Sequence, residues 1–293
     1  MYANISLSET GAASQPLSPL PRGSGEARLT IKKAGTHSHF AERYQQGTMK
    51  VRCPRIHTHS DAEAVLINLG GGLTGGDRVT ITARAEAGAA GTLASQACEK
   101  IYRSLGTDAE LSTTLTLEAG ATLNWLNQPT ILFEAGRVHR KTEVIMAADA
   151  TFVGVEAMIF GRTAMGETVR TGSVRDTIRI RRAGRLIHAE TFSAQGSVQG
   201  SAQGNLEALL ARPAMLGPNK AMATIRYVAP DAEARRDELR ETLKTCESEA
   251  AATAFDGMMF LRFAAPTGQA LMSDLITTLT HLRGQPVPRV WTQ

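Results

Sequence analysis

Asp77-Arg78-Val79-Thr80-Ile81-Thr82-Ala83-Arg84-Ala85-Glu86 is the stretch that sets the expected fold, because apolar residues occupy every second position in it. Successive side chains of a β-strand point to opposite faces, so this period of two predicts a strand with one buried face. The same alternation recurs at residues 111–117 and 174–181. A succession of strands is therefore the dominant signal in this part of the chain.

Short turns separate the predicted strands. They are supplied by the pairs Ala119-Gly120, Ala135-Gly136 and Ala183-Gly184. Residues 26–192 leave no room for crossover helices, which predicts a mainly β body of antiparallel or coiled strands and disfavours a doubly wound sheet. No repeat of fixed length is visible, so the sequence does not predict a regular solenoid.

The last third of the chain adds helices to the β body. Strands are predicted at residues 222–228 and 259–263, and a helix follows each of them, opened by Pro230 and Pro266 respectively. The second helix is expected to end at Gly284. The apolar faces comprise Leu239, Leu243 and Cys246 in the first helix, and Leu271, Leu275, Leu279 and Leu282 in the second. Two C-terminal helices should thus cover part of the strands.

Amino-acid composition indicates the domain organisation and the cellular location to expect for the protein. Residues 1–25 are rich in Ser, Gly, Pro and Ala and predict a flexible tail, which leaves residues 26–293 as a single domain. Cys53, Cys98 and Cys246 are odd in number and lack CxxC spacing, which favours a reducing, cytoplasmic location. No apolar run approaches the roughly 20 residues of a spanning helix, so no membrane insertion is expected.

The charge distribution argues against nucleic-acid binding. The chain has 32 basic and 28 acidic residues, which give a net charge of +4 and are interleaved along the sequence. The densest basic cluster lies at residues 175–185 and contains no aromatic residue on which bases could stack. A solvated sheet face explains this cluster better than an acidic partner does.

The glycine-rich stretch at residues 70–76 is the main alternative signal. Residues 70–75 satisfy the pattern GxGxxG, which would suggest a nucleotide-dependent enzyme. A dinucleotide site needs a helix next, whereas a strand is predicted here, and Asp77 stands where a Walker loop has lysine. We therefore favour a tight glycine turn. The absence of GxSxG and HExxH motifs likewise predicts that the protein is not an enzyme.

Metal-binding motifs in the sequence are weak. His37 with His39 and His57 with His59 form HxH pairs that would point to one side of a strand, but a stable site usually needs three or four ligands. Exposed loop histidines are the favoured interpretation. Cys98 is interpreted as a small thiol lining the core rather than as a reactive group.

Several carboxylates lie beside glycines or within apolar strands: Asp77, Glu99, Glu156, Glu167 and Asp176. A carboxylate in such a run is costly to bury unless it is paired or hydrated. Two interpretations stay open at this point. The acids could form ion pairs with Arg103, Arg162 or Arg175, or they could line a polar passage.

Five sequence blocks resemble the urease accessory protein UreD family, which is called UreH in some organisms. They lie at residues 69–78, 95–104, 123–133, 160–167 and 288–291, in the expected order. The resemblance covers roughly residues 26–291. It implies a β-helix-like fold with a pair of helices and a non-enzymatic scaffold that binds apo-urease and UreF, through which UreG is recruited. It also implies an internal polar passage that leads nickel towards the urease active site.

The resemblance also assigns candidate residues to that passage. Asp77, Glu156, Glu167 and Asp176 match acidic positions of the family blocks and become the predicted nickel path. A conduit must release its ion, so we expect transient nickel(II) and no tightly bound cofactor. This chain departs from the family pattern twice. Pro129 replaces a usual glutamate, and Cys98 replaces a small residue without sulfur, which leaves open a soft ligand on the path.

Overall fold

A computed structural model describes residues 21–54, 61–162, 165–196 and 204–292, and it consists mainly of two β-sheets. The strand order in the first sheet is β14-β13-β11-β8-β5-β1-β2, and in the second it is β16-β17-β15-β12-β9-β6-β4-β3. The first sheet comprises β1 (Ser24–Ala34), β2 (His37–Gly47), β5 (Arg78–Ala85), β8 (Ala109–Leu117), β11 (Arg137–Met146), β13 (Gly172–Arg182) and β14 (Arg185–Gly196). The second comprises β3 (Met49–Arg52), β4 (Ala62–Asn68), β6 (Ala90–Ser95), β9 (Thr122–Leu126), β12 (Thr151–Phe160), β15 (Ala221–Val228), β16 (Glu249–Phe255) and β17 (Met258–Ala265), together with the short strands β7 (Glu99–Ile101) and β10 (Thr130–Leu132) beside β12.

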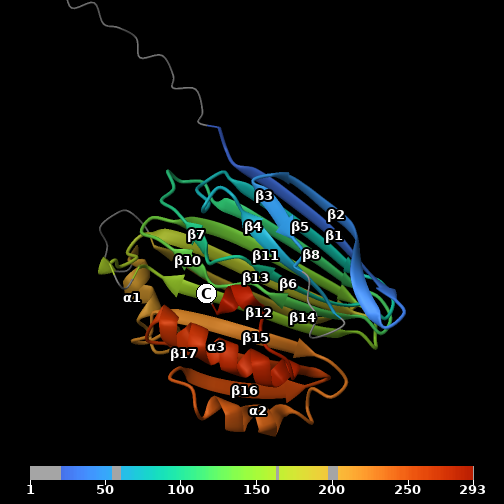
Figure 1. Cartoon of the computed structure of the whole chain (residues 1–293). Helices are drawn as coiled ribbons and strands as arrows, with labels where there is room; N and C mark the ends of the chain where they lie inside the picture. The colour runs from blue at the N-terminus through green and yellow to red at the C-terminus, as the bar shows by residue number, and fades with distance from the viewer. Residues whose placement is uncertain (1–20, 55–60, 163–164, 197–203, 293) are drawn as a thin grey trace, which may run out of the picture.

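The chain passes back and forth between the two sheets and so forms stacked coils (Figure 1). Strands β1, β5, β8, β11 and β13 pair in parallel in the first sheet, and β4, β6, β9 and β12 do so in the second. Antiparallel pairs occur towards the ends of each sheet, as in β1 with β2 and β13 with β14. The predicted mainly β, coiled body is confirmed.

Unequal coil lengths explain why the sequence shows no fixed repeat. The parallel register places Arg78 beside Glu110, Ala109 beside Val138, and Arg137 beside Ser173. Each of these pairs spans one full coil, and the number of residues between the partners differs from coil to coil. Stacking therefore depends on backbone register and on the inward apolar side chains, and not on a repeated sequence.

Apolar side chains from both sheets meet in one core between them. Strand β12 shows how it is built, because Phe152, Met158 and Phe160 join this core while Val153 and Val155 face a second one on the other side. A strand buried on both faces needs a nearly continuous apolar sequence. Glu156 is an even number of positions from Phe152 and Met158 on the same strand, so its side chain points to the same face, between the sheets.

Helices α2 (Arg236–Leu243) and α3 (Gly268–Arg283) cover the outer face of the second sheet beside β15, β16 and β17 (Figure 1). The hydroxyl of Thr267 accepts a hydrogen bond from the Ala270 amide, and Gly284 ends α3 with a φ of 65°. Both predicted helices are confirmed. However, α2 begins later than Pro230, and Cys246 lies beyond its end.

Two short helices complete the described elements, α1 (Leu206–Leu210) and the 3-10 helix η3 (Arg289–Trp291). No helix in the described parts of the chain is long and apolar enough to cross a membrane. Strand β1 begins at Ser24, two residues before the boundary expected for the tail, and residues 1–20 of that tail lie outside the described residues.

Candidate functional site

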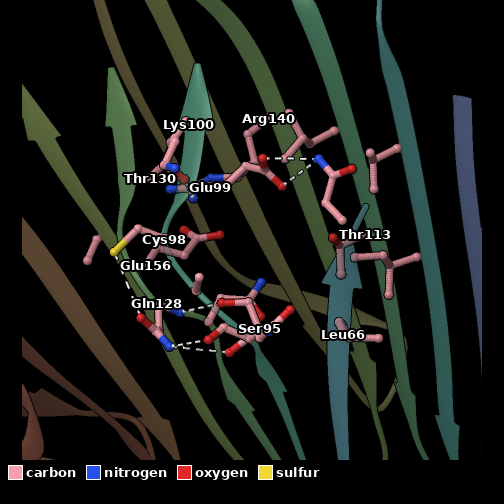
Figure 2. Close-up of a pocket in the computed structure, with 18 of the residues that line it drawn as sticks. Leu66, Ser95, Cys98, Glu99, Lys100, Thr113, Gln128, Thr130, Arg140 and Glu156 are labelled. Atoms are coloured by element: carbon pink, nitrogen blue, oxygen red, sulfur yellow. Dashed lines mark hydrogen bonds between the residues drawn. The ribbon is translucent and has the colours of Figure 1, made fainter. Parts of the chain in front are cut away.

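A cavity of about 270 Å³ lies between the two sheets, and polar side chains line it (Figure 2). The walls come from successive coils, with Arg140 and Thr142 of β11 on one side and Glu156 of β12 on the other. The other polar or charged lining residues include Asn68, Cys98, Glu99, Lys100, Gln128 and Thr130. Apolar residues such as Leu66, Ile81 and Trp125 complete the lining. A cavity in the core that gathers several polar and charged side chains is the candidate functional site.

Two short strands bring the Cys98 segment to the cavity. Strand β7 (Glu99–Ile101) pairs in parallel with β10 (Thr130–Leu132), so two chain segments about one coil apart lie side by side. The Glu99 carboxylate accepts hydrogen bonds of 3.1 and 3.2 Å from the Asn68 amide, and burial raises its pKa. Pro129, where the family pattern has glutamate, is part of this junction, because its carbonyl accepts from the Glu99 amide at 3.2 Å.

Cys98 lies next to Gln128 in the cavity wall, and Figure 2 joins the two with a dashed line. The Sγ atom of Cys98 is 3.9 Å from the side-chain Oε1 of Gln128. The backbone N–H of Gln128 donates to the Ser95 hydroxyl at 2.9 Å. Burial raises the pKa of the Cys98 thiol, which favours its neutral, unreactive form. This geometry agrees with a thiol that lines the interior.

Arginine, carboxylate and histidine side chains from five strands form a cluster between the sheets. We call it the interior ion-pair cluster, and it comprises Arg140, Glu156, Asp176, His188, Glu190 and Arg226. Nε of Arg140 lies 2.9 Å from Oδ1 of Asp176. Arg226 joins two acids, with Nη1 3.2 Å from Oε2 of Glu156 and Nη2 2.8 Å from Oε2 of Glu190. The cluster thus links β11, β12, β13, β14 and β15 electrostatically.

The protein environment moves the pKa values of the two glutamates in opposite directions. Burial, followed by the nearby Asp176 charge, raises the pKa of Glu156, although Arg140, Arg226 and the Thr142 hydroxyl oppose this rise. His188 and the guanidinium groups of Arg226 and Arg262 lower the pKa of Glu190 to about 2. Glu190 therefore stays ionised throughout the neutral range.

A second cavity, of about 460 Å³, lies beside β14 and β17, next to Glu190 of the cluster. Glu190 and Arg262 line it together with Thr224 and apolar residues of β15. Nη2 of Arg262 is 3.0 Å from Oε1 of Glu190, while 61% of the Arg262 side chain is exposed. The interior ion-pair cluster therefore contacts both cavities, through Glu156 in the first and Glu190 in the second.

The structure brings together two of the four acids that the sequence assigned to the nickel path. Glu156 and Asp176 belong to the interior ion-pair cluster and affect each other electrostatically. Glu167 instead pairs with Arg162, with Oε2 2.9 Å from Nε, and lines a separate pocket beside α1. Arg162 was one of the predicted arginine partners. Arg140 and Arg226, which pair with the cluster acids, were not.

Asp77 stands apart from the cluster and organises the glycine turn. Its carboxylate accepts hydrogen bonds from the amides of Gly23, at 2.7 Å, and Thr74, at 2.8 Å. Strand β5 follows immediately, so the helix that a nucleotide site requires is replaced by a strand. The Asp77 carboxylate also occupies the Thr74 amide of the turn. The strand–turn–helix arrangement of a dinucleotide site is therefore not formed at residues 70–76, which counts against the alternative of a nucleotide-dependent enzyme there.

Of the two histidine pairs, only His37 and His39 lie within the described residues, and neither lines the two cavities. His37 and His39 are exposed on β2 at the edge of the first sheet. His57 and His59 lie outside the described residues. Within the described ranges, no group of three His, Cys, Asp or Glu side chains is arranged to hold a metal ion.

Sequence reasoning missed Arg140, His188, Glu190 and Arg226. Arg226 carried the same signal as Glu156, namely a charge inside the apolar run of residues 221–229. His188 and Glu190 lie in a strand whose mixed composition hides which face is buried. Their role emerges only when β14 pairs with β13 and places them beside β15.

Comparison with known proteins agrees with the sequence blocks. The family model for UreD urease accessory protein matches residues 23–292. Proteins named urease accessory protein UreD are similar throughout, including one from Azorhizobium caulinodans that is 41% identical over 270 residues, covering 92% of this chain and 96% of the relative. One from Rhizobium leguminosarum bv. viciae is 42% identical over 271 residues, covering 92% and 95% respectively. The chain belongs to the UreD urease accessory protein family.

Proposed function

We propose that this protein is a non-catalytic scaffold for nickel insertion into urease. In this proposal it binds apo-urease and UreF, recruits UreG through UreF, and lets nickel(II) pass through its interior towards the urease active site. Membership of the UreD family supports the accessory role. The position of the buried Glu156 in the wall of a polar interior cavity supports the nickel route.

The chemistry of the interior suits a transient ion. A conduit has to admit its ion and then release it, which favours separated carboxylates over a closed cage of thiolates and imidazoles. Glu156 and Asp176 each share their charge with an arginine, so an arriving ion would compete with a resident cation. Such competition weakens net binding and favours release.

We place the assembly in the cytoplasm. Cys53, Cys98 and Cys246 are all free thiols, as expected in a reducing compartment. The partner surfaces should each bury well above about 1,000 Å², as stable assemblies require.

The proposal is tested by co-expressing the chain with urease, UreF and UreG. We expect all four to co-purify, and we expect Glu156→Gln to lower the nickel content of urease while the complex is still recovered. Metal analysis of purified urease measures this. Glu241→Gln is the matched control, since Glu241 is an exposed acid of α2 that pairs with Lys244. Full nickel loading of urease without this chain would rule the proposal out, and full loading with Glu156→Gln would rule out the interior route.

A further inference from the structure

Arg226 of β15 is a buried cation placed among carboxylate and imidazole side chains, which are of the types that bind metal ions in other proteins. Only 4% of Arg226 is exposed. Its guanidinium donates to Glu156 at 3.2 Å and to Glu190 at 2.8 Å. Nε2 of His188 lies 3.4 Å from the same Glu190 oxygen. Two carboxylates and an imidazole thus gather around one guanidinium group.

This set of side chains has the chemistry of a divalent-cation site. Imidazole and carboxylate groups are common ligands of nickel and zinc. Arg140 is paired with Asp176, so Glu156 and Glu190, when both are ionised, carry more negative charge than the Arg226 guanidinium can neutralise. Arg262 also contacts Glu190, but it is 61% exposed, so solvent screens its contribution. A divalent ion would balance both carboxylates.

The hydrogen bonding around the guanidinium is incomplete. Nε of Arg226 and Nε2 of His188 are buried and have no hydrogen-bond partner among the described residues. Buried polar atoms are normally paired, because an unpaired buried group has lost its contacts with water and gained no hydrogen bond in return. Arg226 therefore pairs with both acids but leaves two polar atoms of the cluster without a hydrogen bond. A small ion that bound His188 directly would remove one of these deficits.

The position of Arg226 also connects the two cavities. Glu156 lines the interior cavity of about 270 Å³, and Glu190 lines the second cavity of about 460 Å³. Arg226 hydrogen-bonds one acid from each. An ion that moved from one cavity to the other through these acids would have to take the place of its guanidinium.

We propose that Arg226 is an exchangeable counter-cation that occupies a divalent-cation site formed by Glu156, His188 and Glu190. Metal–ligand distances of about 2.0–2.2 Å are shorter than the hydrogen bonds that Arg226 makes, so the guanidinium holds the ligands too far apart to chelate. Displacement of the guanidinium lets them close on the ion, and its return expels the ion. The identity of the ion as nickel(II) rests on the proposed function, but the existence of the site does not.

Nickel(II) titration of the purified full-length chain tests the site without urease. We expect Arg226→Gln, which removes the competing charge, to bind one nickel ion about tenfold or more tightly than the unchanged protein in calorimetry. The double variant Arg226→Gln/Glu190→Gln should lose this gain. Arg182→Gln is the matched control, because Arg182 donates to the Asp256 carbonyl away from the cluster and should leave nickel binding unchanged.

Folding is controlled by a second measurement, since Arg226→Gln leaves buried acids without their partner. Nickel(II) should raise the Tm of Arg226→Gln more than that of the unchanged protein, and it should not do so for the double variant. Equal nickel affinity and equal Tm shifts in Arg226→Gln and the unchanged protein would overturn the proposal. That result would leave the scaffold function untouched, because co-purification with urease tests that function separately.

Discussion

Arg140 and Asp176 are register partners on the neighbouring parallel strands β11 and β13, and their side chains form an ion pair in the protein interior. Only 13% of the Arg140 side chain and 14% of the Asp176 side chain are exposed. The backbone ladder therefore fixes both the partner and the distance. Such a pair contributes little over an apolar pair, but loss of one member leaves a buried charge.

The first prediction concerns this ion pair. We expect Arg140→Gln to lower the free energy of unfolding by about 3–5 kcal/mol, because the largely buried Asp176 then lacks its paired cation. Urea denaturation measures the change. Arg84→Gln is the control, since Arg84 forms an exposed pair with Glu118 whose loss should lower the stability far less. Equal losses in the two variants would show that the interior pair is not buried in solution.

The second prediction concerns the acid stability that Glu190 provides. Its pKa falls from 4.5 to about 2 on folding, so its contribution is complete above pH 4.5 and disappears as the pH drops towards 2. We expect Glu190→Gln to be less stable than the unchanged protein at pH 6. The difference should shrink steadily between pH 4.5 and 2, which urea midpoints at several pH values measure. A constant difference across that range would contradict the lowered pKa.

The third prediction separates Asp77 from the interior acids. Asp77→Asn keeps only one amide-accepting oxygen for the Gly23 and Thr74 donors. We expect it to cost about 1–3 kcal/mol of stability, as expected for one lost hydrogen bond to a charged group. Nickel loading of urease, corrected for the amount of folded protein, should not change. A specific loss of loading without a loss of stability would place Asp77 on the nickel route after all.

The fourth prediction compares two neighbouring glycines of the turn. Gly72 has a φ of 147°, and an added Cβ would overlap the Tyr102 ring and lie 2.8 Å from the Lys100 carbonyl oxygen. We expect Gly72→Ala to cost about 2–4 kcal/mol of folding free energy. Gly71 has a φ of 68° and open space around its Cα, so Gly71→Ala should cost only about 1 kcal/mol. Thermal unfolding of both variants provides the comparison, and equal costs would exclude close packing as the reason for the glycine at position 72.

Local patterns predicted the individual elements well. Period-two alternation identified β5, β8 and β13, and the leucine stripe with Thr267 and Gly284 identified α3 and its ends. These features depend on residues close together in the chain. The start of α2 was less accurate, because turns continue after Pro230 and the helix begins only at Arg236.

Pairing between distant strands could not be predicted in the same way. The alternation of residues 172–182 shows that β13 has one buried face, but it does not show that Asp176 meets Arg140 of β11. Unequal coil lengths removed the repeat that would have revealed the parallel register. For the same reason, the sequence located Glu156 in an apolar strand without identifying Arg226 as its partner.

The antiparallel strands at the ends of both sheets limit how far the coils can extend. Strands β2 and β14 border the first sheet, and β3 and β16 border the second, each running against its neighbour. A stack of parallel coils with bare ends could add further copies and grow into a fibre. Here the antiparallel border strands end each stack after a fixed number of coils. The strand topology therefore also fixes the length of any path that an ion could take through the interior.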